Sequence, residues 1–352
     1  PESSSEVISS YDLGINRSFE NFNILYYGSY SMFDDSISRN YYWHQLGFYL
    51  ENDHSIFGLY AEQRINKSDF DIYDFTSFSG YYKYHFDWDF AIPTIFTSIN
   101  YKVYSNLEDY NNLLFNGGIS LNKSFETRTT LILNASFNYK NYTNSITIQD
   151  TSVVETENAE TPLNGYGKGK GRNHTDFTGI GNSNLGTRNT SQLFLNLRMA
   201  QSLFESTGLA AYYTNRTITH TSGSVFGDFE YNFVDESDLF DDPISRNENS
   251  FGAELTQLIF DDVTTKIGYQ YSKRKYISQG IYLNDSEYNL EVDRDDNQQS
   301  FFANISKPIS FDENDSFILK IGLNFYYLKN SSNSYWYNYT GSGASINLNF
   351  QF

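Results

Sequence analysis

The chain contains no cysteine, so neither a disulfide framework nor a thiolate metal site can form. Proline occurs only 5 times and methionine only 2 times in 352 residues. No run of about 18 apolar residues is present, which excludes a membrane-spanning helix. Basic residues are also scarce, because 24 Lys and Arg stand against 43 Asp and Glu, for a formal net charge of −19. This balance argues against nucleic acid as a partner.

Signatures of catalysis and of metal binding are missing as well. The sequence has neither the H-E-x-x-H pattern of zinc proteases nor a G-x-S-x-G nucleophile turn. Acidic residues gather at 34–35, 69–74, 235–242 and 285–296, but without the spacing of a calcium hand. Solvated surface charge is therefore favoured over Ca²⁺ binding, which stays the alternative. We predict that the chain is not an enzyme and holds neither a cofactor nor a metal.

Aromatic residues are abundant, with 31 Tyr and 30 Phe. They recur in segments where apolar and polar side chains alternate, which is typical of strands with two different faces. Most of these segments are longer than an ordinary strand of about 5–6 residues, and they suit a tilted membrane strand of about 9–11 residues. The fourteen predicted strands are 22–33, 41–51, 55–65, 76–86, 94–105, 112–122, 128–142, 190–202, 207–219, 249–260, 264–277, 297–309, 316–330 and 342–352.

The last of these strands carries a family resemblance. From Gly343 onward every second residue is apolar, and the final residue is aromatic. This ending resembles the final strand of bacterial outer-membrane β-barrels, which carries an assembly signal; the residues matching that signal are Ile346, Leu348, Phe350 and Phe352. The resemblance implies a Gram-negative outer membrane, with lipid, lipopolysaccharide and the barrel-assembly machinery as partners. The fold class that it implies is all-β, a transmembrane antiparallel up-and-down barrel.

Connection lengths agree with this fold, because short and long connections alternate along the chain. Such a barrel has short periplasmic turns and long extracellular loops. We predict about fourteen strands, with sixteen as the alternative, and the last strand closing against 22–33. An even number places both termini in the periplasm. Residues 1–21 are predicted to be a periplasmic lead-in, in which 11–16 could form a short strand, and 22–352 a single barrel, with long extracellular loops at 143–189, 220–248 and 278–296.

The polar N-terminal stretch that begins at Pro1 looks like a mature or trimmed terminus. We therefore expect that an export signal has been removed. Whether a periplasmic domain precedes Pro1 is left open by the sequence.

On most strands, the odd-numbered and even-numbered residues form two different faces, one predicted to contact lipid and the other to line the lumen. Rings of Lys and Arg favour anions in a pore, although the same charges could simply pair across a wet wall. Nine basic residues are predicted to face the lumen: Arg64, Lys83, Lys102, Lys140, Arg198, Arg216, Lys266, Arg274 and Lys320. A soluble β-protein whose apolar faces meet in a core is the alternative to the barrel, but fourteen such faces are easier to cover with lipid.

The loop predicted at 143–189 contains a run of glycines and bases. It lacks the G-K-[ST] ending of a phosphate loop. A mobile surface loop is slightly favoured, and the alternative is a gating or partner-binding segment formed by Gly165, Gly167, Lys168, Gly169, Lys170, Gly171 and Arg172.

Two functions fit these features. The first is an outer-membrane channel for small polar, preferentially anionic, solutes. The second is an anchor, scaffold or export barrel whose long loops bind a surface or periplasmic protein partner.

Overall fold

The computed structural model describes the chain apart from residues 1–6, 21, 35–36, 148–183, 223–242, 261, 278, 286, 290, 312–316 and 352. Regular structure in the described part is β-strand with short 3₁₀ turns. The strands are β1 (Ile8–Ser18), β2 (Asn23–Phe33), β3 (Tyr41–Glu51), β4 (Ser55–Asn66), β5 (Phe75–His85), β6 (Ile92–Tyr104), β7 (Asn112–Ser124), β8 (Thr129–Thr147), β9 (Asn184–Phe204), β10 (Thr207–Ser222), β11 (Arg246–Ile259), β12 (Val263–Tyr276), β13 (Ile281–Tyr282), β14 (Tyr288–Asn289), β15 (Arg294–Ser310), β16 (Ile318–Ser332) and β17 (Tyr339–Gln351).

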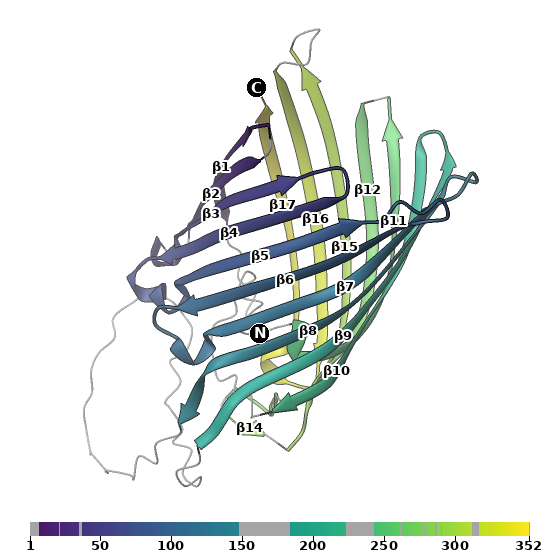
Figure 1. Cartoon of the computed structure of the whole chain (residues 1–352). Helices are drawn as coiled ribbons and strands as arrows, with labels where there is room; N and C mark the ends of the chain where they lie inside the picture. The colour runs from purple at the N-terminus through teal and green to yellow at the C-terminus, as the bar shows by residue number, and fades with distance from the viewer. Residues whose placement is uncertain are drawn as a thin grey trace, which may run out of the picture.

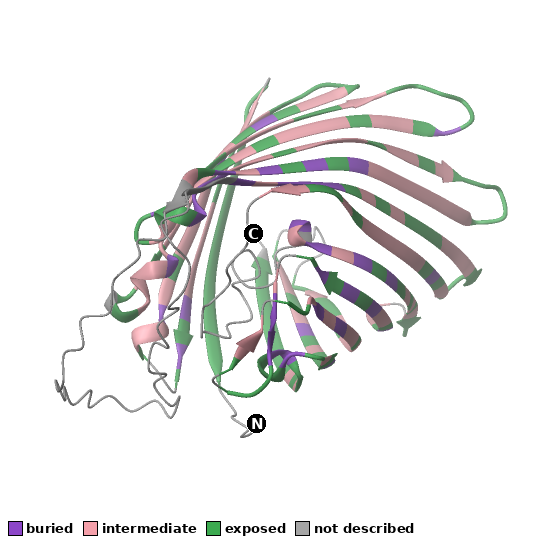
Figure 2. Ribbon diagram, turned by 90° about the horizontal axis from the view of Figure 1, so that it is seen from below, coloured by how far each residue is buried: buried purple, intermediate pink, exposed green. Residues whose placement is uncertain are grey.

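Fifteen of these strands form one sheet in which neighbours in sequence are neighbours in space. β13 and β14 form a separate two-stranded hairpin inside the connection between β12 and β15. Every described pair is antiparallel, so the prediction of an all-β, antiparallel, up-and-down sheet is confirmed. The sheet curves strongly, and in Figure 1 strands β3 to β8 run in front of β15, β16 and β17. Figure 2 shows the same curvature along the strands.

The predicted number of fourteen strands is wrong, because the predicted lead-in contains a strand. β1 pairs with β2 along its whole length, from Ile8 opposite Phe33 to Ser18 opposite Asn23. β2 therefore has β1 and β3 as its partners and is not closed by the last strand, as had been expected. Within the described residues, β17 pairs with β16 and no pairing joins it to β1.

Short and long connections alternate as predicted from β1 to β15, and they define two ends of the sheet. The alternation does not hold for the last two connections, because 311–317 is not shorter than 333–338. The short-turn end carries the connections 19–22, 52–54, 86–91, 125–128, 205–206, 260–262 and 311–317. The long-connection end carries 34–40, 67–74, 105–111, 148–183, 223–245, 277–293 and 333–338. With fifteen strands, Ile8 lies at the long-connection end and Gln351 at the short-turn end. The even-number argument that placed both termini on one side is thus wrong for this sheet.

The bounds of the three longest predicted loops also change. β8 and β9 extend into 143–189, β10 and β11 extend into 220–248, and the hairpin β13–β14 occupies part of 278–296. The 3₁₀ turns lie in long connections: η1 (Ile37–Arg39), η2 (Ser68–Tyr73), η3 (Glu108–Tyr110), η4 (Pro243–Ser245) and η5 (Tyr335–Tyr337). The described part of the chain has no helix that is long and apolar enough to cross a membrane.

The two faces of the sheet reverse the usual distribution of polarity. On β8 the alternating residues Phe137 and Tyr139 are exposed by 40% and 36%, whereas Asn138 and Lys140 are exposed by only 8% and 5%. On β9, Leu193 and Met199 are likewise exposed. The predicted lipid face is therefore the exposed face, and the predicted lumen face is the more buried one. A soluble protein would instead bury its large apolar side chains.

Substitutions on adjacent residues of β6 test which solvent covers each face. Ile99 lies on the apolar face and is 49% exposed, whereas Ser98 lies on the inner face. If lipid covers the apolar face, Ile99→Arg lowers the free energy of unfolding by about 2–4 kcal/mol, as measured by urea titration of the protein refolded into lipid vesicles. Ser98→Arg should have a much smaller effect. Equal effects would contradict the assignment of the faces.

Candidate functional site

The inner face of the sheet brings together all nine of the predicted lumen-facing bases. Residues that are directly opposite in neighbouring strands share a face, and the register connects the bases from strand to strand. Arg64 lies opposite Phe75, Lys102 opposite Ser77 and Lys140 opposite Thr190. The same face continues through the cross-strand pairs Arg198–Tyr212, Arg216–Glu248, Glu248–Arg274, Lys266–Asn304 and Lys320–Asn349.

These bases form two groups that differ in exposure. Near the long-connection end the cations are wholly or partly buried, and most of them lie over an aromatic ring. Arg64 lies 4.0 Å from the ring centroid of Tyr41, Lys102 lies 4.4 Å from that of Phe75, and Arg216 lies 4.6 Å from that of Phe194. Cation–π attraction is strengthened when the pair is withdrawn from water. We call this group, with Lys140 and Arg274, the stacked cations.

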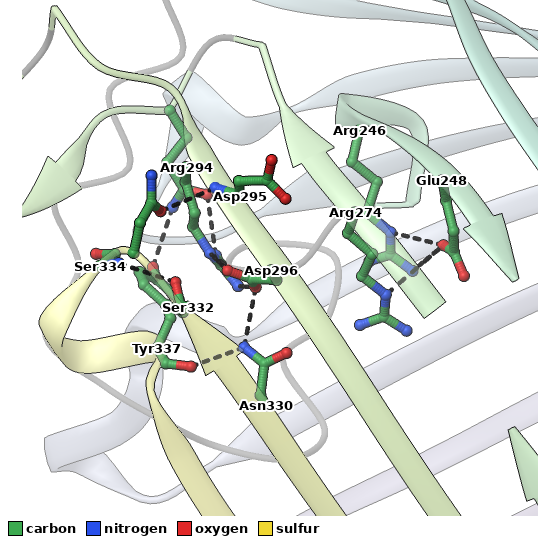
Figure 3. Close-up of polar contacts among 12 residues, drawn as sticks. Arg246, Glu248, Arg274, Arg294, Asp295, Asp296, Asn330, Ser332, Ser334 and Tyr337 are labelled. Atoms are coloured by element: carbon green, nitrogen blue, oxygen red, sulfur yellow. Dashed lines mark hydrogen bonds and ion pairs between the residues drawn. The ribbon is translucent and has the colours of Figure 1, made fainter. Parts of the chain in front are cut away.

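Glu248 is the carboxylate around which three arginines gather, and Figure 3 shows two of them, Arg246 and Arg274, beside it. Its Oε2 lies 2.9 Å from Nη2 of Arg246, 3.7 Å from Nε of Arg216 and 3.8 Å from Nε of Arg274. The carboxylate side chain is only 5% exposed. One carboxylate therefore lies against three guanidinium groups, of which those of Arg246 and Arg274 are largely buried.

A second buried group surrounds Arg294, which lies over the rings of Tyr276 and Tyr337 with centroid distances of 4.0 and 3.3 Å. Its guanidinium donates to Asp296, and Asn330 donates to the same carboxylate over 3.0 Å and to the carbonyl oxygen of Tyr337 over 2.7 Å (Figure 3). Through Tyr337 this group fixes η5 to the inner face. It thereby ties the connection 333–338 to the wall.

Arg188 forms a third buried group at the same end of the sheet. Its guanidinium lies 4.2 Å from the ring centroid of Tyr142 and 5.1 Å from that of Tyr110, and it donates to the carbonyl oxygen of Asp109 over 2.8 Å. Burial raises the pKa of the Tyr110 hydroxyl, and this effect exceeds the opposing influence of Arg188. Tyr110 therefore remains a neutral phenol at physiological pH.

The other four bases, Lys83, Arg198, Lys266 and Lys320, are exposed. They lie on the same inner face but towards the short-turn end. Arg198 lies 3.5 Å from Glu254, and its side chain is still 46% exposed. We call these four the exposed cations. Lys83 also lies over a ring, with its Nζ 5.5 Å from the centroid of Tyr81, but its side chain stays exposed, as do those of the other three.

Several residues of these clusters were not among the predicted lumen bases. Arg188, Arg246 and Arg294 were missed, together with the acids Glu248 and Asp296. A local signal exists for two pairs, because Arg246 precedes Glu248 and Arg294 precedes Asp296 by two residues, which places both members on one face of a strand. The signal was hidden because these residues were assigned to the predicted loops 220–248 and 278–296.

The predicted segment Gly165–Arg172 lies outside the described residues, as does Phe352 of the predicted assembly signal. The other members of that signal, Ile346, Leu348 and Phe350, share the exposed apolar face of β17. Among the described residues, no group of three or more His, Cys, Asp and Glu is arranged to hold a metal ion.

No protein-family model matches the chain, and no curated protein matches its sequence. Solved structures similar to it are outer-membrane proteins. One is OmpT of Vibrio cholerae with loop L8 deleted, at 11% identity and a TM-score of 0.35, covering 98% of this chain and 100% of that chain. Another is the outer-membrane transporter YddB of Escherichia coli, at 10% identity and a TM-score of 0.39; 98% of this chain matches 61% of that one.

The cluster around Glu248 makes a stability prediction. Glu248→Gln removes a buried charge that lies against three guanidinium groups, two of them largely buried, and breaking a buried ion pair costs about 3–5 kcal/mol. Urea titration in lipid vesicles should show a loss of this order in the free energy of unfolding. Glu51→Gln is the matched control, because Glu51 is an exposed acid of the inner face, and its effect should stay within about 0.5 kcal/mol. Equal losses in the two variants would show that Glu248 is not the hub of the cluster.

Proposed function

We propose that the chain is an outer-membrane channel that passes small polar solutes and favours anions. The observation that supports this proposal most directly is the reversal of polarity across one continuous sheet. Exposed apolar side chains cover one face, while the other carries Asn, Ser, Gln, Lys and Arg. Lipid is the solvent that suits the first face, and water suits the second.

The exposed cations supply the preference for anions. Lys83, Arg198, Lys266 and Lys320 belong to β5, β9, β12 and β16, so they are distributed around the curved wall. Charged rings of this kind lower the barrier for ions of opposite sign. The stacked cations have a different role in this proposal, because they hold the long-connection end in a fixed shape. The large negative charge of the whole chain does not contradict the preference, since selectivity is decided by the charge along the path.

Planar-bilayer recordings test both parts of the proposal. The purified chain, and a variant lacking residues 148–183, should produce stepwise increases in conductance when added to the bilayer. Under a salt gradient, the reversal potential should indicate selectivity for anions. If neither protein raises the conductance above that of detergent alone, the channel proposal fails.

Charge reversal identifies the residues responsible. Lys83→Glu combined with Lys320→Glu should move the reversal potential towards cations by a several-fold change in permeability ratio, because two reachable positive charges become negative. Lys273→Glu with Lys275→Glu is the matched control. These lysines share the outward face of β12 with Ile267 and Tyr269, so the same change of charge there should leave selectivity almost unchanged. If only the control pair shifts selectivity, the assignment of the path is wrong.

A further inference from the structure

Two tyrosines on neighbouring strands of the inner face lie in nearly the same orientation. The rings of Tyr60 on β4 and Tyr81 on β5 have centroids 5.6 Å apart and planes inclined by only 14°. Their hydroxyl oxygens are 3.3 Å apart, and the Tyr60 hydroxyl donates to that of Tyr81. We call this pair the tyrosine platform.

Each ring of the platform lies across a glycine of the adjacent strand. A Cβ added to Gly47 would lie 2.6 Å from Cε1 of Tyr60, and one added to Gly58 would lie 2.2 Å from Cε1 of Tyr81. The glycines therefore allow one face of each ring to rest against the backbone of the wall. Covering a glycine explains that contact. The opposite face of each ring is turned away from the wall, and over the Tyr81 ring Nζ of Lys83 lies 5.5 Å from the ring centroid.

The residues around the platform supply hydrogen-bonding groups of both kinds. Lys83 lies opposite Ile56 on β4, and Ile56 lies opposite Glu51 on β3. Lys83 and Glu51 are thus two strand spacings apart, or about 10 Å, and both are exposed. The lysine offers only donors and the carboxylate only acceptors. On the far side of Lys83, Phe96 lies directly opposite it on β6.

From this arrangement we propose that the tyrosine platform binds a saccharide, with one sugar ring lying flat on Tyr60 and Tyr81. The face of an aromatic ring is electron-rich, so it attracts the polarised C–H groups on the flat side of a sugar. Glu51 accepts hydrogen bonds from sugar hydroxyls, and Lys83 donates to hydroxyl or carboxylate oxygens. The inference rests on the proposed function, because it requires that the inner face be open to water.

Another aromatic ring on the inner face serves as a control that distinguishes sugar binding from a purely structural role of the platform tyrosines. Tyr212 lies across Gly252, with its Cζ 2.2 Å from the position of an added Cβ. It therefore covers a glycine in the same way as the platform tyrosines do. No second ring stacks beside it among the ring pairs of the described residues, so Tyr212→Leu is a matched control for the loss of a ring above a glycine.

Isothermal titration calorimetry of the full chain in detergent tests the proposal, with maltohexaose as a neutral probe and oligogalacturonate as an acidic one. We expect the unaltered protein to bind at least one of the two. Tyr60→Leu combined with Tyr81→Leu should weaken that binding about tenfold or more. Tyr60→Phe with Tyr81→Phe should retain it, because the ring faces remain. Tyr212→Leu should bind like the unaltered protein.

Folding of each variant is checked by the difference in electrophoretic mobility between heated and unheated samples. If the double leucine variant does not fold, Glu51→Gln with Lys83→Gln takes its place. It leaves both rings in position and should weaken binding several-fold.

Three results would overturn the platform: no binding of either oligosaccharide, equal weakening by Tyr212→Leu, or unchanged binding in the variant that removes both rings or both charges. Because calorimetry does not require conduction, the two proposals can fail separately. A protein that binds sugar without conducting contradicts the channel alone, and one that conducts without binding either probe contradicts the platform alone.

Discussion

The pairing of backbone hydrogen bonds within one sheet is the constraint on which the rest of this structure depends. The strands are arranged in sequence order, so each strand that is not at an edge of the sheet forms its backbone N–H and C=O hydrogen bonds with its two neighbours. This arrangement frees the side chains from the need to form a central apolar core. They are instead divided between an apolar exposed face and a polar, more buried inner face.

The charged residues of the inner face have different surroundings at the two ends of the sheet. At the long-connection end, Arg246, Glu248, Arg294 and Asp296 are buried in ion pairs, and other cations lie over aromatic rings. Charges in such contacts have little access to water, and they hold the connections at this end of the sheet in a fixed conformation. Towards the short-turn end, lysines on the same face stay exposed. The same residue types are therefore buried in contacts at one end of the inner face and exposed at the other.

The alternation of side chains was sufficient to predict an antiparallel up-and-down sheet and to place the nine predicted bases on one face, but the predicted strand number and the predicted partner of the last strand were wrong. It was not sufficient for β1, whose serines, glycine and asparagine weaken the apolar pattern around Leu13 and Ile15. The buried clusters also escaped prediction, since contacts such as Arg274 with Glu248 depend on cross-strand register. The same holds for Tyr81 over Gly58, because an isolated glycine in a strand does not indicate which ring will cover it.

The fifteen-stranded count has a directional consequence. In an alternating sheet, the first and last of an odd number of strands point the same way, so β1 and β17 both run from the long-connection end to the short-turn end. Joined directly, these two edges would form a parallel seam in a wall whose described pairs are all antiparallel. An antiparallel closure would require one further strand, of opposite direction, between them. The odd number of strands alone therefore limits the ways in which this sheet can close into a barrel.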